Sequence, residues 1–253
     1  SGVEAVETAM KLCRKWGYQV KGIPDNQAKI VFAKDNFHGR TISVISASND
    51  EVSTREFGPF VEGIMQVPYN DIQAFENLLK ENKNIAGFIV EPIQGEAGII
   101  IPDETYLSEI RRLCTAYNVL FIADEIQTGI GRTGNLLASY DVFASAHNSK
   151  PDILILGKAL SGGVLPVSAV LADDDIMLTI KPGEHGSTYG GNPLACAVSI
   201  EALQVILDEK LTENSRKMGE ILRSGLRDIA GRMTLIREVR GKGLLTAIEM
   251  NCS

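Results

Sequence analysis

Two residues that could do chemistry together each follow a buried apolar run of this sequence. Lys158 comes two residues after the run 153–156, and Asp124 directly follows the run 119–123. If these runs are strands of one parallel sheet, both side chains emerge at its carboxyl edge, where ligands bind. Each residue alone is more often structural, because a lysine after a strand is commonly solvated and an aspartate can cap the next helix. Together they are the pair that a pyridoxal site requires: an amine that forms a Schiff base, and an acid that keeps the ring nitrogen protonated.

Two stretches could bind the phosphate of such a cofactor. Ser1, Gly2 and Val3 open a predicted helix, whose N-terminus offers backbone amides. The stretch 186–193 combines hydroxyl groups with glycines, which let the backbone approach a ligand closely. Either stretch could instead be an ordinary helix start or a tight glycine turn before a helix.

An aromatic ring and a guanidinium group lie close together at residues 37–40. Phe37 could stack on a flat cofactor, and Arg40 could bind a substrate carboxylate. Taken separately, such a phenylalanine is more often part of the core, and such an arginine is more often on the surface.

The elements that must position these residues alternate along the chain. Short apolar runs predict buried strands, and the amphipathic stretches between them predict helices. This alternation indicates an α/β fold with a mainly parallel sheet of the seven-stranded type and helices on both faces. The predicted strands are 29–33, 85–90, 119–123, 153–156 and 167–171; the predicted helices are the opening stretch up to Gly17, then 71–81, 106–117, 193–208 and 211–229.

Two further strands, predicted at 235–240 and 244–250, indicate that a second unit begins near the end of the sequence. We therefore expect a large cofactor-binding domain at residues 1–232 and the start of a small α+β domain at residues 233–253. A natural domain seldom opens on a helix cap, so we expect that parts of both domains lie outside these 253 residues. The 253 residues alone are then expected to show little or no activity, because catalysis requires all the residues that position the reacting groups.

Composition argues against several kinds of partner. The 25 basic and 32 acidic residues give a net charge of -7 without a Lys/Arg cluster, so nucleic acid is a poor candidate. No apolar run approaches the roughly 20 residues that span a bilayer, so we expect no membrane partner. The four cysteines lie far apart, which favours a reducing compartment and gives no reason to expect a metal. We expect the cytoplasm, with the mitochondrial matrix as the alternative.

Six short motifs occur in the order typical of one enzyme family. They are Ser-Gly-Val-Glu-Ala at residues 1–5, Phe-His-Gly-Arg at 37–40, Glu-Pro-Ile-Gln-Gly-Glu at 91–96, Asp-Glu-Ile-Gln-Thr-Gly at 124–129, Gly-Lys-Ala at 157–159 and Gly-Ser-Thr at 186–188. In these motifs the sequence resembles the class III aminotransferases over nearly its whole length. The resemblance implies pyridoxal 5'-phosphate as the cofactor and the large-domain fold of the fold type I transferases. The stretch 173–188 most resembles members of the class that act on ornithine.

The resemblance also implies a role for each matching residue. Lys158 and Asp124 would be catalytic, with Lys158 carrying the cofactor and Asp124 bonding its ring nitrogen. The other cofactor contacts would be Gly2 and Val3 at the phosphate, Phe37, Ile126 and Gln127 at the ring, and Ser187 and Thr188 at the phosphate of the neighbouring subunit of a homodimer. The substrate contacts would be His38, Arg40, Glu91 and Glu96. Arg40 would hold a substrate carboxylate, and Glu96 would mask a second arginine. His38 departs from the larger aromatic residue that relatives often carry.

The implied reaction moves the terminal amino group of L-ornithine to 2-oxoglutarate, giving glutamate 5-semialdehyde and glutamate. Lys158 would transfer the proton in both half-reactions. Enzymes of the same class that act on acetylornithine or 4-aminobutyrate would share Lys158, Asp124 and Gln127, although Glu96 weighs against most of them. An alternative of a different kind is a catalytically inert chain that keeps the fold and serves only for packing or dimerisation.

Overall fold

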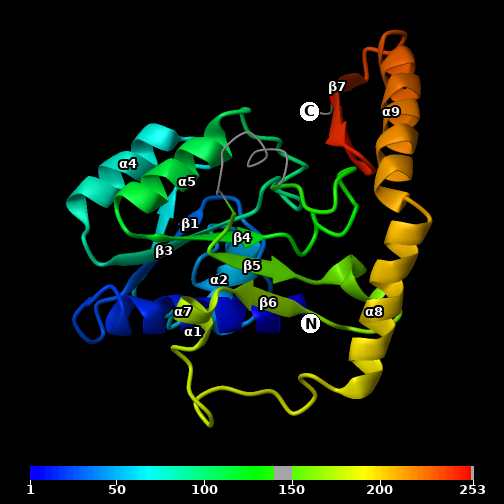
Figure 1. Cartoon of the computed structure of the whole chain (residues 1–253). Helices are drawn as coiled ribbons and strands as arrows, with labels where there is room; N and C mark the ends of the chain where they lie inside the picture. The colour runs from blue at the N-terminus through cyan, green and yellow to red at the C-terminus, as the bar shows by residue number, and fades with distance from the viewer. Residues whose placement is uncertain (140–149, 252–253) are drawn as a thin grey trace.

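The computed structural model describes residues 1–139 and 150–251, and its centre is a six-stranded sheet (Figure 1). The strands lie in the order β2-β1-β3-β4-β5-β6. β1 to β5 are parallel to one another, and β6 pairs antiparallel with β5. Their bounds are β1 (Lys29–Ala33), β2 (Ile64–Val67), β3 (Ile85–Val90), β4 (Leu120–Asp124), β5 (Ile153–Leu156) and β6 (Ala169–Ala172).

Helices cover both faces of this sheet, as the alternating pattern predicted. α1 (Gly2–Gln19) packs on one face, and α4 (Ile72–Glu81) and α5 (Tyr106–Ala116) pack on the other (Figure 1). Alternate residues of the central strands enter the two cores, so that Ile122 packs with α1 whereas Phe121 packs with α5. The mainly parallel sheet with helices on both faces is therefore confirmed.

Short helices connect the strands at the edge where β1, β4 and β5 end. They are α2 (Ile42–Ile45), α3 (Glu51–Thr54) and the 3-10 helix η1 (Lys158–Ser161); a further short helix, α7 (Asp174–Met177), follows β6 at the opposite edge. Because each is only four residues long, this edge consists mostly of loops, which is where binding residues tend to occur.

Two long helices lead from the sheet to a separate hairpin. α8 (Pro193–Asp208) and α9 (Leu211–Ala230) run along one side of the molecule, and β7 (Ile236–Lys242) pairs antiparallel with β8 (Leu245–Met250) beside α9 (Figure 1). Among the described residues, no helix is both long and apolar enough to cross a membrane.

The described sheet has six strands where the seven-stranded type was expected, and β6, β7 and β8 differ from their expected bounds by one or two residues. Two further differences concern β2 and β4. β2 was not predicted, because three of its four residues are only half-buried at the sheet edge and give no clear apolar run. β4 begins one residue later than expected and includes Asp124, so the catalytic candidate belongs to the strand itself.

Candidate active site

Lys158 and Asp124 lie at the same edge of the main sheet. β4 and β5 are parallel neighbours, and Asp124, the last residue of β4, pairs with Ile155 of β5. Lys158 follows β5 through Gly157 and is the first residue of η1. Both side chains line a cavity of about 170 Å³, hereafter the inner cavity. The remaining lining residues are Gly2, Val3, Phe37, His38, Gly39, Glu91, Ile126, Gln127 and Thr128.

The backbone of Lys158 is held in an unfavourable conformation. Its φ of 42° lies in the left-handed region, which costs a non-glycine residue about 1–2 kcal/mol. Strain of this kind persists only where the surroundings enforce it, and it clusters at functional sites. Here it occurs at the one described lysine that lines the inner cavity.

Glycines bring the start of α1 against the ends of the strands. A Cβ on Gly157 would lie 3.2 Å from the Ile126 side chain and 3.6 Å from the Cα of Gly2. Gly39 has a φ of 128°, and a Cβ on it would overlap the side chain of Val3. A side chain would be crowded at residue 157 and would overlap Val3 at residue 39, so the two glycines allow the close approach. The first residues of α1, Gly2 and Val3, thereby line the inner cavity, where a helix N-terminus favours an anion such as a phosphate.

Asp124 is buried and forms a close ion pair with His38. His38 Nδ1 lies 2.7 Å from Asp124 Oδ2, and the amide of Ile126 donates to Asp124 Oδ1 at 3.0 Å. Burial opposes protonation of His38, but the hydrogen bond to Asp124 and the charges of Asp124 and Glu91 outweigh it and raise the pKa of the imidazole. The pair fixes the orientation of the Asp124 carboxylate at the wall of the inner cavity.

Glu91 is a second buried acid beside this pair. Its carboxylate accepts hydrogen bonds from the amides of Phe37 at 3.1 Å and Gly95 at 3.2 Å. Burial raises the pKa of Glu91 to about 7, with His38 lowering it and Asp124 raising it. Near neutral pH this carboxyl group therefore exists in both protonation states.

Glu125, which the sequence analysis did not single out, organises the loop after β4. Its fully buried carboxylate accepts four hydrogen bonds, from the Thr128 hydroxyl at 2.6 Å, the Ala138 amide at 3.0 Å, and the Ser139 amide and hydroxyl at 2.7 Å each. These bonds tie the two ends of the 125–139 loop together, and this loop carries Gln127, which lines the inner cavity. The one signal in the sequence was an acid directly following a buried strand.

Gln127 and Glu96 meet across two loops. The side-chain amide of Gln127 donates to Glu96 Oε1 at 3.3 Å. A Cβ on Gly95 would overlap the Gln127 amide, so the contact depends on a glycine before Glu96. The predicted cofactor contact and the predicted substrate contact are thus direct neighbours.

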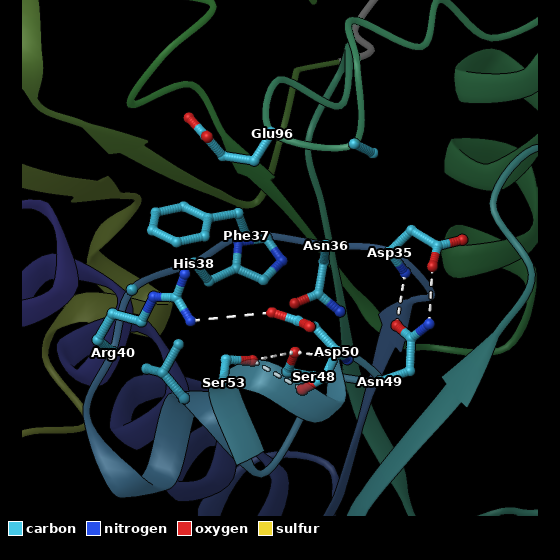
Figure 2. A pocket seen from close by; sticks show the side chains of 13 residues that line it. Asp35, Asn36, Phe37, His38, Arg40, Ser48, Asn49, Asp50, Ser53 and Glu96 are labelled. Carbon is cyan, nitrogen blue, oxygen red and sulfur yellow. Dashed lines mark hydrogen bonds and ion pairs between the residues drawn. The ribbon is translucent and has the colours of Figure 1, made fainter. Parts of the chain in front are cut away.

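A second cavity of about 320 Å³, hereafter the outer pocket, adjoins the first and contains Arg40 and Glu96 (Figure 2). Phe37, His38 and Gly39 line both cavities. The Arg40 guanidinium lies 5.2 Å from the centre of the Phe37 ring and 4.0 Å from Asp50, with both charged side chains more than half exposed. So weak and solvated an ion pair leaves Arg40 available to a carboxylate ligand. Figure 2 shows Glu96 on the other side of the Phe37 ring from Arg40.

Ser187 and Thr188 do not join the other predicted site residues. Both are exposed, and neither lines the inner cavity. Their loop is anchored on α1 instead, because His185 forms hydrogen bonds of 2.9 Å with Thr8 and with Lys11. Within the described chain, these two hydroxyls are therefore separate from the inner cavity.

The chain belongs to the class-III aminotransferase family, whose sequence profile (Aminotransferase class-III) matches residues 1–253. The mitochondrial ornithine aminotransferase of Rattus norvegicus is 59% identical over 248 residues, which are 98% of this chain and 55% of that protein. Ornithine aminotransferase of Plasmodium falciparum isolate 3D7 is 55% identical over 98% of this chain. The chain therefore spans a little over half the length of the curated relatives that it matches, such as 59% of the Plasmodium protein.

Two solved structures share this fold, and they belong to enzymes named for two related activities. Ornithine aminotransferase from Toxoplasma gondii ME49 superposes with a TM-score of 0.95 at 48% identity, covering 99% of this chain and 58% of that one. Acetylornithine aminotransferase from Elizabethkingia anophelis superposes with a TM-score of 0.87 at 56% identity, covering 100% of this chain and 60% of that one.

Proposed function

We propose that this chain forms the cofactor site of a pyridoxal-phosphate-dependent ornithine aminotransferase, which transfers the terminal amino group of L-ornithine to 2-oxoglutarate. One observation carries the proposal: the amine of Lys158 and the carboxylate of Asp124 converge on one cavity, from neighbouring parallel strands. The names of the relatives from Rattus and Plasmodium support ornithine as the substrate.

The residues around the inner cavity fit pyridoxal phosphate. Asp124, oriented by His38, would hold the ring nitrogen, and the first amides of α1, at Gly2 and Val3, would hold the phosphate. Phe37, Ile126 and Gln127 supply two apolar walls and an amide donor for a flat polar ring. When bound, the cofactor supplies an electron sink for the carbon that carries the substrate amine.

The chain's own groups account for the remaining chemistry. Lys158 would bind the cofactor through its amine and, once released, move a proton to and from the substrate carbon. Asp124 would keep a proton on the ring nitrogen, and the buried His38 would keep Asp124 in place.

Two charged groups in the outer pocket support a substrate that is charged at both ends. Arg40 would bind the α-carboxylate of ornithine, which leaves the terminal amine to reach Lys158. Glu96 would neutralise a second arginine while ornithine is bound, and would release it when the carboxylates of 2-oxoglutarate need an anchor.

We also propose that the protein works as a homodimer with shared sites. α8 leaves apolar side chains on the surface, with Leu194, Ile200 and Leu207 each at least 60% exposed. Exposed apolar patches of this kind mark association surfaces. The exposed loop with Ser187 and Thr188 lies directly before α8, so the same contact could deliver these hydroxyls to the partner's phosphate.

A second candidate is acetylornithine aminotransferase, which the 56% identity to the Elizabethkingia structure favours. A coupled assay on the full-length protein separates the two, with ornithine, N-acetylornithine and 4-aminobutyrate as alternative donors and 2-oxoglutarate as acceptor. We expect kcat/KM for ornithine to exceed the others at least about tenfold, a difference of ~1.4 kcal/mol in transition-state binding. A preference for N-acetylornithine would favour acetylornithine aminotransferase over the proposed function. A protein without a borohydride-sensitive absorption band would contradict the proposal that pyridoxal phosphate is the cofactor.

A further inference from the structure

Arg240 of β7 reaches from the hairpin to the turn that follows β3. Its Nε donates to the carbonyl oxygens of Gly98 at 2.9 Å and Ile99 at 3.1 Å, and its Nη2 donates to Gly98 O at 2.7 Å. The side chain is only 17% exposed, although its charge would ordinarily favour full solvation. The contact joins residues more than 140 positions apart, and it ends two residues from Glu96.

The rest of the guanidinium is held within the hairpin. Nη1 donates to Glu238 Oε2 at 2.7 Å and also to the Glu249 carboxylate of β8. These two acids neutralise the charge and fix the plane of the guanidinium, so that its remaining donors point at the turn. Arg240 is therefore a rigid connection rather than a flexible surface side chain.

The turn that Arg240 contacts has a backbone conformation that is unfavourable for one of its residues, Ile99. Gly98 has a φ of 108°, and Ile99, a β-branched residue, has a φ of 58°. A β-branched side chain in the left-handed region is a genuine outlier, which the surroundings have to enforce. The Gln94 to Ile100 bridge closes the base of the turn, and the hydrogen bonds from Arg240 reach the Gly98 and Ile99 carbonyls from outside it.

The tip of the same hairpin contacts the loop after β4. The amide of Leu244 donates to the carbonyl of Arg132 at 3.0 Å, and a Cβ on Gly243 would overlap the backbone of Thr133 and Gly134. The hairpin thus touches both loops that approach each other through Gln127 and Glu96. Its position bears directly on that contact.

We propose that Arg240 is a specificity-determining positioning residue: by holding the strained turn at Gly98 and Ile99, it keeps the Glu96 carboxylate beside Gln127 and so determines which end of an amino donor is anchored. The inference rests on the proposed function, because it names a determinant of that enzyme's donor choice. When the hydrogen bonds from Arg240 are lost, the turn relaxes and Glu96 moves away from Gln127. The enzyme then accepts donors through an α-amine as well as through a terminal amine.

The test compares Arg240→Met with Arg237→Met in the full-length, cofactor-loaded enzyme. Arg237 lies on the same strand and also bonds Glu249, but it is 67% exposed and its described hydrogen bond stays within the hairpin, so it is a matched control. The measured quantity is kcat/KM for ornithine divided by kcat/KM for glutamate as competing amino donor. We expect Arg240→Met to lower this ratio about tenfold, as for the loss of hydrogen bonds from a charged donor. The control should stay within about twofold, as exposed ion pairs contribute little.

Each other outcome has a defined meaning. A proportional loss of both activities, with the ratio unchanged, overturns the proposal, because it would give Arg240 a purely structural role. If Arg240→Met does not fold, Arg240→Lys replaces it: lysine keeps the charge beside Glu238 and Glu249 but cannot span to both carbonyls, and an unchanged ratio there overturns the proposal equally. A wild-type enzyme inactive with ornithine contradicts the proposed function instead. A ratio that changes in Glu96→Gln but not in Arg240→Met contradicts the positioning inference alone.

Discussion

The Lys158 amine is the group on which the proposed chemistry depends, because it is the described lysine that lines the inner cavity with Asp124. Lys158→Ala should abolish the absorption band that borohydride removes from the wild-type protein and should reduce turnover by several orders of magnitude. Mass spectrometry of the reduced, digested protein checks the assignment. Lys181→Ala is the control: because Lys181 is exposed and does not line the inner cavity, this variant should keep the adduct on Lys158. Finding the reduced cofactor on any other lysine would exclude this site.

Glu91 should make the stability of the protein depend on pH. Its folded pKa of about 7 exceeds the ordinary value of 4.5, so the folded state binds its proton more tightly than the unfolded state does. That contribution to stability is present below the unfolded pKa and is lost as pH rises through the folded pKa. Between pH 5 and 7.5 the wild type should lose on the order of 2–3 kcal/mol more unfolding free energy than Glu91→Gln. Urea unfolding at both pH values measures the difference, and parallel losses in the two proteins would show that Glu91 is not the titrating group.

At the level of elements, Gly39 sets the distance between the 37–40 loop and α1. Alanine at Gly39 would meet the side chain of Val3 at a φ of 128°, whereas Gly22 also has a positive φ, of 79°, but no described atom within 4 Å of a new Cβ. Both substitutions incur backbone strain, but only Gly39→Ala must also push α1 away. We expect Gly39→Ala to destabilise the protein by about 1–3 kcal/mol more than Gly22→Ala and to weaken cofactor binding, as followed by thermal unfolding and cofactor titration. Equal effects would mean that the contact with Val3 is easily relieved.

Most elements could be predicted because their sequence patterns reflect burial. α4 and α5 agree with the prediction to within one residue, since each has a single apolar face, and α8 begins at the predicted Pro193. β2 could not be predicted, since an edge strand is half-solvated and lacks a continuous apolar run. The antiparallel direction of β6 was equally inaccessible, because a short apolar run carries no information about strand direction.

Two residues of the candidate site could be placed directly from their own strands. Asp124 and Lys158 follow apolar runs, so the end of each strand fixes where they lie. Glu125 and Arg240 act on backbone groups that are 13 or more positions away, and that proximity exists only after the loops have folded. The pattern of apolar and polar residues in one sequence does not indicate such long-range contacts.

At the level of the whole molecule, the proposed shared site makes a specific prediction for mixed dimers. Lys158→Ala subunits should be inactive, and Thr188→Ala subunits should bind the cofactor weakly. In a hybrid dimer of the two variants, one site combines an intact Lys158 with an intact Thr188 from the other subunit, so co-expression should restore up to half of the wild-type activity per dimer. Activity assays on affinity-separated hybrids check this. Hybrids no more active than the Thr188→Ala dimer would mean that Thr188 serves its own subunit.

The wall formed by Phe37, His38 and Gly39 has a practical consequence for redesign. Because these three residues line both cavities, a substitution in the wall alters the chamber for the cofactor and the vestibule for the substrate together. Ser48, Asn49 and Ser53 line only the vestibule (Figure 2). Changes there can resize the entrance for bulkier amines while the chamber keeps its shape, so a search for new donors is best begun at those three positions.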